Sequence, residues 1–275
     1  MASEHSRCIL KVIGDKGTLA VIDPGQPDTW PADVRDHIDR LAESCKANPQ
    51  NSRETPSCEL TPETVDAFTA EREFLEVLGN RMIVLYHATR LLPHELVRVE
   101  QLGLLILSEE ERHQRLDSVI EHYGDVITPE RLEALRSSGP LARDSLQRSA
   151  RLGVLYGITP LGATFEDAGS SMTVFLENWG GESFYWAAYS DEDIAETIGE
   201  LTRQSIATIV EFAVPASWLD RYSHVWQIFV GQLRGWDGAC GEFRLGQSIP
   251  PRQILELLHE HSPRWPLEVG PLTSP

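Results

Sequence analysis

Long apolar segments are missing from this sequence, because no uninterrupted run approaches the roughly 18–20 residues that a helix needs to span a bilayer. The opening segment from Met1 to Cys8 also lacks the basic-then-apolar order of a secretory signal. We therefore expect a cytoplasmic protein with no membrane partner.

Cysteine is scarce, with four residues at Cys8, Cys45, Cys58 and Cys240. None belongs to a C-x-x-C pair, and none has a histidine at the spacing of a zinc site, so the sequence predicts no bound metal. Dispersed cysteines of this kind are typical of a cytosolic chain, and we expect four reduced thiols.

Basic residues are outnumbered, since 24 Lys and Arg stand against 42 Asp and Glu and give a formal net charge of −18. The average field of such a molecule repels duplex nucleic acid, and the sequence contains no dense Lys/Arg cluster that would reverse this locally. The acidic excess is interpreted first as a feature that favours solubility, and only second as a hint of a basic partner.

The sequence does contain enough apolar residues to form a packed core. Of its 275 residues, 41% are apolar and 24% are charged, which are values typical of globular proteins with one or two domains. Strand and helix patterns mix without regular βαβ alternation. This arrangement favours the α+β class over a doubly wound parallel sheet.

Residues 1–80 are predicted to form a small hairpin and helical region without chemical signals. The expected elements are strands over 8–13 and 18–22 around a Gly/Asp turn, helices over 31–46 and 61–78, and a polar loop from 46 to 60. Apolar stripes on both helices need burial. We therefore expect this region to pack against the main domain or to dock another protein.

Residues 81–262 are predicted to form the main domain, followed by a proline-rich tail over 263–275. The expected strands cover 82–87, 104–107, 152–158, 183–188, 206–214 and 242–245, and the expected helices cover 92–102, 108–123 and a last segment that begins at Pro250-Pro251 with Ile254 and Leu258 inward. The strand over 183–188 is rich in aromatic residues.

Three places in this domain combine polar chemistry with rigid elements. They are the segments Tyr86–Arg90, at the end of a buried strand, Gly180–Trp186, in the aromatic strand, and Cys240–Phe243, at the start of a late strand. A histidine is thus followed by an aromatic strand and then by a glutamate. A small residue and a threonine follow the histidine, and the last glutamate opens the run Glu-Phe-x-Leu…Ile-Pro-Pro-x-x-Ile.

In this order the sequence resembles the ADP-ribosyltransferase family over about residues 82–260, in the His–Tyr–Glu branch shared by diphtheria-type toxins and poly-ADP-ribose polymerases. The resemblance implies a split mixed β-sheet with flanking helices and a cleft for NAD as co-substrate. It assigns catalysis to Glu242, His87 and Tyr185. Glu242 would stabilise the positive charge that develops on the ribose when the nicotinamide bond breaks.

The resemblance also implies a set of NAD contacts. His87 would hold a ribose, the backbone beside it at Ala88 would bind the nicotinamide amide, and Thr89 would bond a ribose hydroxyl. Tyr185 would stack on the nicotinamide ring, and Arg90 would pair with a diphosphate oxygen.

Residues for acceptor recognition are assigned by their position near the predicted catalytic groups. Trp236 and Asp237 lie in the glycine-spaced loop before Glu242, and Glu182 precedes the aromatic strand. Trp236 could stack on a base or ring of the acceptor, or it could pack against the core. Glu182 could assist Glu242 or cap the Gly-Gly turn. Cys240 stands where arginine-modifying relatives carry Glu or Gln, so arginine modification is not expected.

Each site residue also has a structural explanation when it is taken alone. His87 could be a hydrogen-bonded residue at a strand end, Tyr185 could fill the core, and Glu242 could be an exposed edge charge. Thr89 and Arg90 could be ordinary turn residues. The functional prediction depends on the joint order of all three segments.

The predicted function is NAD-dependent transfer of ADP-ribose to a macromolecular acceptor, with release of nicotinamide, as in a bacterial toxin or defence effector. The acceptor, a protein or a nucleic acid, is left open, as is an antitoxin or other regulatory partner. One alternative is an RNA 2′-phosphotransferase or NAD-hydrolysing enzyme, although Arg90 and Arg151 do not form an obvious phosphate-binding set. Another is a non-catalytic module that binds a nucleotide or a partner.

Overall fold

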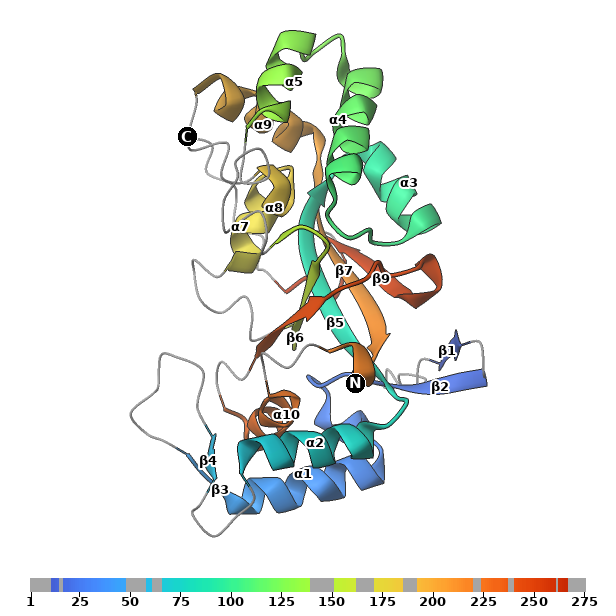
Figure 1. The fold of residues 1–275 in the computed structure, drawn as a ribbon, viewed down its shortest axis with the longest axis vertical. Coiled ribbons are helices and arrows are strands. Elements are labelled where there is room, and N and C mark those ends of the chain that lie inside the picture. Colours follow the sequence, from blue (N-terminus) through green and yellow to red (C-terminus); the bar gives the residue numbers. More distant parts are fainter. Residues whose placement is uncertain are drawn as a thin grey trace, which may run out of the picture. The chain divides into compact units, whose positions relative to one another are not determined.

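The chain contains both helices and a β-sheet, as the predicted α+β class requires (Figure 1). It divides into two units. The computed structural model describes residues 11–14, 17–47, 58–60, 66–138, 151–161, 171–184, 192–219, 224–236, 240–260 and 262–266. The first unit comprises Met1–Tyr86, Gly157–Glu166 and Phe212–Phe243, and the second comprises His87–Tyr156, Asp167–Glu211 and Arg244–Pro275. The units therefore alternate along the chain, whereas the sequence predicts consecutive domains that meet near residue 80.

The bounds of the elements are as follows. The strands are β1 (Lys11–Gly14), β2 (Gly17–Ile22), β3 (Cys45–Ala47), β4 (Cys58–Leu60), β5 (Met82–Leu91), β6 (Leu155–Thr159), β7 (Ile206–Pro215), β8 (Gly241–Leu245) and β9 (Ile254–His259). The α-helices are α1 (Ala32–Ser44), α2 (Ala67–Leu78), α3 (Pro93–Leu102), α4 (Glu109–Tyr123), α5 (Pro129–Arg136), α7 (Ser171–Glu177), α8 (Gly181–Phe184), α9 (Glu192–Gln204) and α10 (Val225–Arg234). None of the helices in these described ranges is both long and apolar enough to cross a membrane.

The main sheet has seven strands in the order β1-β2-β5-β6-β8, with β7 paired to β5 and β9 paired to β7. The hairpin predicted near the N-terminus is confirmed, because β1 and β2 are antiparallel neighbours. Strand β2 continues in parallel to the start of β5, where Val21 lies beside Met82. Strand β6 is antiparallel to β5, with Tyr86 opposite Ile158.

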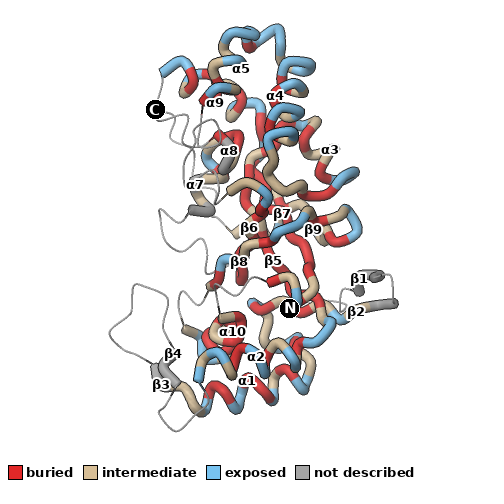
Figure 2. The backbone as a smooth tube through the Cα atoms, viewed as in Figure 1, coloured by how far each residue is buried: buried red, intermediate tan, exposed pale blue. Residues whose placement is uncertain are grey.

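The first unit is held together by three helices with aromatic rings between them. Helices α1, α2 and α10 contact one another, and Figure 2 shows buried positions along all three. Phe229 of α10 contacts Trp30 at 4.7 Å and Phe74 of α2 at 4.9 Å between ring centroids. Val34 and Ile38, from the predicted apolar stripe of α1, are fully buried. The stripes of residues 1–80 are thus buried in part by α10, which comes from much later in the chain.

The second unit has an apolar core of its own, built mainly by α4, α5, α8 and α9. Its buried members are Leu92, Leu116, Val119, Ile127, Leu132, Leu135, Trp179, Phe184, Ile194, Ile198 and Leu201. The rings of Trp179 and Phe184 stack at 5.4 Å between centroids with an interplanar angle of 11°. Gly180 turns the chain between them at a φ of 103°, and a side chain there would lie 2.7 Å from Phe184 Cβ.

Three local predictions from the sequence are wrong. The first part of the predicted aromatic strand is helix α8, because Phe184 is drawn into the core against Trp179. The predicted last helix is the 3-10 turn Pro251–Gln253 followed by strand β9, which pairs with β7. The predicted strand over 104–107 is reduced to one bridge between Leu104 and Ile249.

The polar loop predicted between the first two helices contains short paired strands. Strands β3 and β4 are antiparallel, with Cys45 opposite Leu60. Cys45 takes part in a disulfide, whereas Cys240 is a reduced cysteine. The prediction of four reduced thiols is therefore wrong for Cys45.

Candidate functional site

Strand β5 presents different residues on its two faces. Its first half, Met82–Tyr86, is a buried apolar run, as expected for a strand covered on both faces. Beyond it, His87, Thr89 and Leu91 alternate with Ala88 and Arg90. Because side chains alternate along a strand, the first three share one face. All three line a cavity in the second unit.

The cavity has a volume of about 140 Å³ and, as far as the chain is described, is lined only by residues of the second unit. Strand β6 contributes Tyr156, helices α3 and α4 contribute charged side chains, and Gly180 and Gly181 form part of the wall. A volume of this size is comparable with an engineered cavity of about 150 Å³ that binds benzene. It can therefore hold one ring or one sugar, but not a whole dinucleotide.

His87 is held in one defined chemical form. Its Nδ1 lies 2.9 Å from the carbonyl oxygen of Tyr156, so Nδ1 must carry the proton and donate. Burial lowers the pKa of His87 below its ordinary value, and the charge of Arg115 lowers it further, against the opposing effect of the bond to Tyr156. The ring is therefore neutral near pH 7, and its Nε2 is a hydrogen-bond acceptor.

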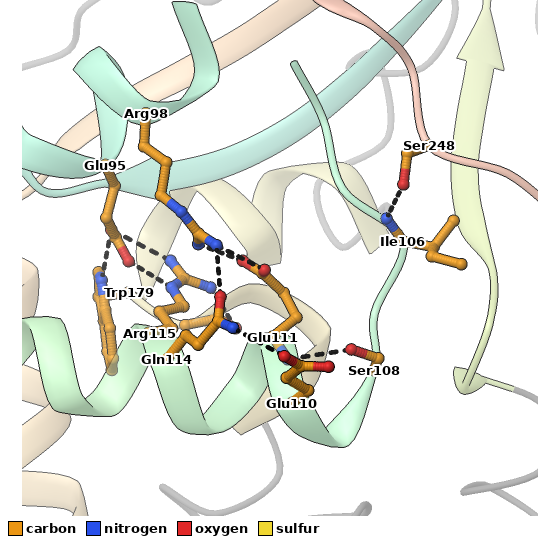
Figure 3. Close-up of polar contacts among 11 residues, drawn as sticks. Glu95, Arg98, Ile106, Ser108, Glu110, Glu111, Gln114, Arg115, Trp179 and Ser248 are labelled. Atoms are coloured by element: carbon orange, nitrogen blue, oxygen red, sulfur yellow. Dashed lines mark hydrogen bonds and ion pairs between the residues drawn. The ribbon is translucent and has the colours of Figure 1, made fainter. Parts of the chain in front are cut away.

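Glu95 is the centre of a buried network between α3 and α4 (Figure 3). Its carboxylate forms an ion pair with Arg115 and accepts hydrogen bonds from the Trp179 Nε1 at 2.9 Å and the Leu92 amide at 2.8 Å. The Arg115 guanidinium also lies 4.7 Å above the Trp179 ring. Burial by itself would raise the pKa of Glu95, but Arg115 and the hydrogen-bond donors hold this pKa below its ordinary value. Glu95 is therefore an ionised structural group.

A second ion pair lies beside this network. Arg98 of α3 reaches Glu111 of α4 with both terminal nitrogens, one of them 2.6 Å from Glu111 Oε2, and also donates to Gln114 at 3.2 Å (Figure 3). Both members of this pair line the cavity. The fork-to-fork geometry fixes the two helices against each other at the cavity wall.

Arg112 lines the same cavity but is bonded differently. Its side chain is nearly fully buried, with an exposed fraction of 4%, and its Nη atoms donate to the carbonyl oxygens of Leu135, Arg136 and Ser138 at 2.7–2.9 Å. The guanidinium lies 4.8 Å above the Phe184 ring. Burial lowers the pKa of Arg112 to about 10, so that it remains a cation at neutral pH.

Arg90 and Ala88 lie on the other face of β5. The Arg90 guanidinium donates to Ser205 Oγ at 3.0 Å and to the carbonyl oxygens of Leu176, Thr202 and Ser205 at 2.8–3.3 Å. All three of its nitrogens are thus engaged within the second unit. These bonds make Arg90 an anchor for β5 and do not leave it free for a diphosphate.

Two predicted residues that the structure describes, Glu242 and Trp236, are not members of this cavity wall. Glu242 is exposed on β8, and Trp236 is half-buried just after α10, where its amide donates to the Gly231 carbonyl at 2.9 Å. Both belong to the first unit. Tyr185, Asp237 and the side chain of Glu182 lie outside the described residues, so their predicted roles stay predictions.

The sequence interpretation missed the charged wall of the cavity, namely Glu95, Arg98, Glu111, Arg112 and Arg115. It also missed the position of Tyr156 beside His87. A signal for Arg112 exists in the sequence. Arg112 precedes the buried Leu116 by four positions and Val119 by seven, so it continues the apolar stripe of α4 and points inward. Nothing in the sequence identifies its carbonyl partners.

No family model matches the sequence, and neither a curated protein nor a solved structure matches it. The functional interpretation of the cavity therefore depends on its geometry and on the residues that line it.

Proposed function

We propose that the protein binds NAD, with one ribose in the cavity of the second unit, and transfers the ADP-ribose group to a macromolecular acceptor with release of nicotinamide. The observation that supports this proposal is the shared placement of His87 and Thr89. They are two residues apart on β5 and line the same cavity, which is large enough for one sugar. The proposed fold for this activity is the ADP-ribosyltransferase fold.

The residues present suit a ribose. Within the described part of the chain, the Nε2 of His87 has no hydrogen-bond partner, and as an acceptor it can receive a ribose hydroxyl. Thr89 supplies a hydroxyl that both donates and accepts, and its side chain is close to fully buried. Tyr156, on the neighbouring strand, adds an aromatic residue to the wall. These groups would bind and orient the sugar. NAD itself would contribute the reactive bond, which joins this ribose to nicotinamide and breaks in the reaction.

The test is a titration of the full chain with NAD by calorimetry, together with an assay for released nicotinamide. His87→Asn keeps a donor near the position of Nδ1, for the bond to Tyr156, but removes the Nε2 acceptor. Loss of one such hydrogen bond should weaken NAD binding about tenfold. The exposed His113 on α4 provides a matched control, and His113→Asn should bind NAD as the wild type does. Wild-type protein that neither binds NAD nor releases nicotinamide would refute the proposal.

The proposed role of Glu242 depends on the sequence resemblance alone, and a separate experiment tests it. Glu242→Gln should retain NAD binding and lose nicotinamide release, because a neutral amide cannot stabilise the developing positive charge. Unchanged nicotinamide release by this variant would remove Glu242 from the catalytic assignment while leaving the proposed NAD site intact.

A further inference from the structure

Helices α3 and α4 are joined at three levels by pairs of side chains. Starting from the connection between the two helices, the pairs are Arg98 with Glu111, Glu95 with Arg115, and His94 with His122. The residue numbers fall along α3 as they rise along α4, so the two helices form an antiparallel hairpin. The first two pairs join opposite charges and line the cavity, whereas the third joins two histidines at the far end.

The two histidine rings lie face to face. Their centroids are 4.2 Å apart at an interplanar angle of 12°, and the Tyr123 ring lies 6.0 Å from the ring of His94. The lone pair of an imidazole nitrogen lies in the plane of its own ring, so two nearly parallel rings cannot both direct a nitrogen at one metal ion. The Nδ1 of His122 donates to the Ser118 carbonyl at 2.9 Å. The pair is therefore a contact between rings and not a metal site.

This contact accommodates His94 only in its neutral form. Both of its ring nitrogens are buried, and neither has a hydrogen-bond partner among the described residues, whereas a charged imidazolium needs acceptors for two N–H groups. Burial lowers the pKa of His94 below its ordinary value of 6.5. On α3, Glu95 opposes this shift and raises the pKa. On α4, Glu121 also raises it, whereas His122 and Arg115 lower it further.

We propose that the contact between His94 and His122 is a pH-sensitive switch, which holds α3 against α4 while His94 is neutral and releases the two helices when His94 takes up a proton. A second proton, on His122, would place two positive charges on rings 4.2 Å apart. His94 directly precedes Glu95, and both helices carry lining side chains, so release loosens the cavity wall. The effect on NAD rests on the proposed function, whereas the release itself does not.

The pH range of the switch follows from proton linkage. The open hairpin exposes His94 to water, where its pKa returns to about 6.5, whereas its pKa in the closed contact is lower. Below pH 6.5 the open form therefore binds one more proton than the closed form. Each further pH unit favours opening by up to about tenfold, until the lowered pKa is reached and the effect stops growing. Above pH 6.5 this contact adds no pH dependence.

The first test follows the ring signals of His94 by nuclear magnetic resonance during a pH titration of the full chain. These signals are identified by their nuclear Overhauser effects to the rings of His122 and Tyr123. We expect His94 to titrate below pH 6.5 and to lose these effects as it becomes protonated. A His94 ring that titrates at pH 6.5 or above, or that stays stacked when it is charged, overturns the proposal without any variant.

The second test measures the protection factors of amides in α3 and α4 at about pH 7.5 and about pH 5.5 by hydrogen exchange. His94→Phe keeps a flat ring on His122 but cannot take up a proton. Protection in the wild type should fall by up to about tenfold more than in this variant. His113→Phe removes an exposed imidazole from α4 and is the matched control, which should respond as the wild type does. Equal losses in wild type and His94→Phe overturn the proposal.

Bound NAD should reduce the loss of protection in acid, because a ligand of the closed cavity wall opposes its opening. The two proposals fail separately. A His94-dependent loss of protection in protein that does not bind NAD would retain the switch and reject the proposed function. NAD binding that depends on His87, without a His94-dependent loss of protection, would do the reverse.

Discussion

The aromatic rings of the two units have different neighbours. In the first unit, rings contact rings, as where Phe229 lies 4.7 Å from Trp30 and 4.9 Å from Phe74. In the second unit, Trp179 and Phe184 stack on each other and each also contacts a guanidinium group, with Arg115 above Trp179 and Arg112 above Phe184. The first core is therefore stabilised mainly by apolar burial, which is insensitive to pH. The second depends on charges that stay buried only while their partners are present.

The largest expected effect comes from breaking the charge network of the second unit. Glu95→Gln leaves Arg115 buried without its counter-charge and should lower the free energy of unfolding by about 3–5 kcal/mol. Urea unfolding combined with residue-resolved hydrogen exchange measures this and shows which unit opens. Glu100→Gln, on an exposed position of the same helix, is the matched control and should change stability by less than about 0.5 kcal/mol. A Glu95→Gln protein as stable as the control would contradict the comparison.

A smaller effect is expected from acid. The pKa of Glu95 lies below its ordinary value of 4.5, so its ionised form stabilises the fold at pH values above 4.5, and this contribution is lost as the pH falls through the lowered pKa. The protection factors of amides in α3 and α4, which are corrected for the intrinsic exchange rate at each pH, should therefore fall on acidification below pH 4.5 more in the wild type than in Glu95→Gln. Identical acid dependence in the two proteins would show that other groups dominate.

The smallest effect should come from a polar contact outside the charge network. Ser248 Oγ accepts a hydrogen bond of 3.0 Å from the half-buried amide of Ile106 (Figure 3). Ser248→Ala should cost about 0.5–1.5 kcal/mol, because water can replace part of this bond. The chemical denaturation midpoint measures the change. A loss as large as that of Glu95→Gln would mean that polar contacts in the second unit are uniformly important and that its network is not special.

Several elements of the fold could be predicted from local patterns. The apolar stripe of Val34 and Ile38 gives α1, and the buried run that begins at Met82 gives β5. The last strand could not be predicted in this way. Ile254 and Leu258 are spaced by four and suggest a helix, but pairing with β7 makes the segment a strand. Strand pairing between segments so far apart in sequence outweighs the local spacing of apolar residues. The sequence alone does not indicate which strands pair.

The candidate site was predictable only in part. His87 and Thr89 could be placed together because alternation along a strand brings residues two apart to one face. Arg90 was expected at the ligand, yet the neighbouring position on the same strand necessarily faces away, and its acceptors come from segments up to 115 residues distant. The charges of α3 and α4 could not be assigned, because an arginine in a polar helix looks the same in sequence whether it is buried or solvated.

The anchoring of β5 by Arg90 has a consequence for ligand affinity. Four bonds to α7, to the end of α9 and to Ser205 hold the strand from behind, on the face opposite to the cavity. The backbone that carries His87 and Thr89 is thus preorganised, and an incoming molecule need not spend binding free energy on ordering it. Loosening this anchor would weaken the affinity for a ligand that Arg90 itself never touches.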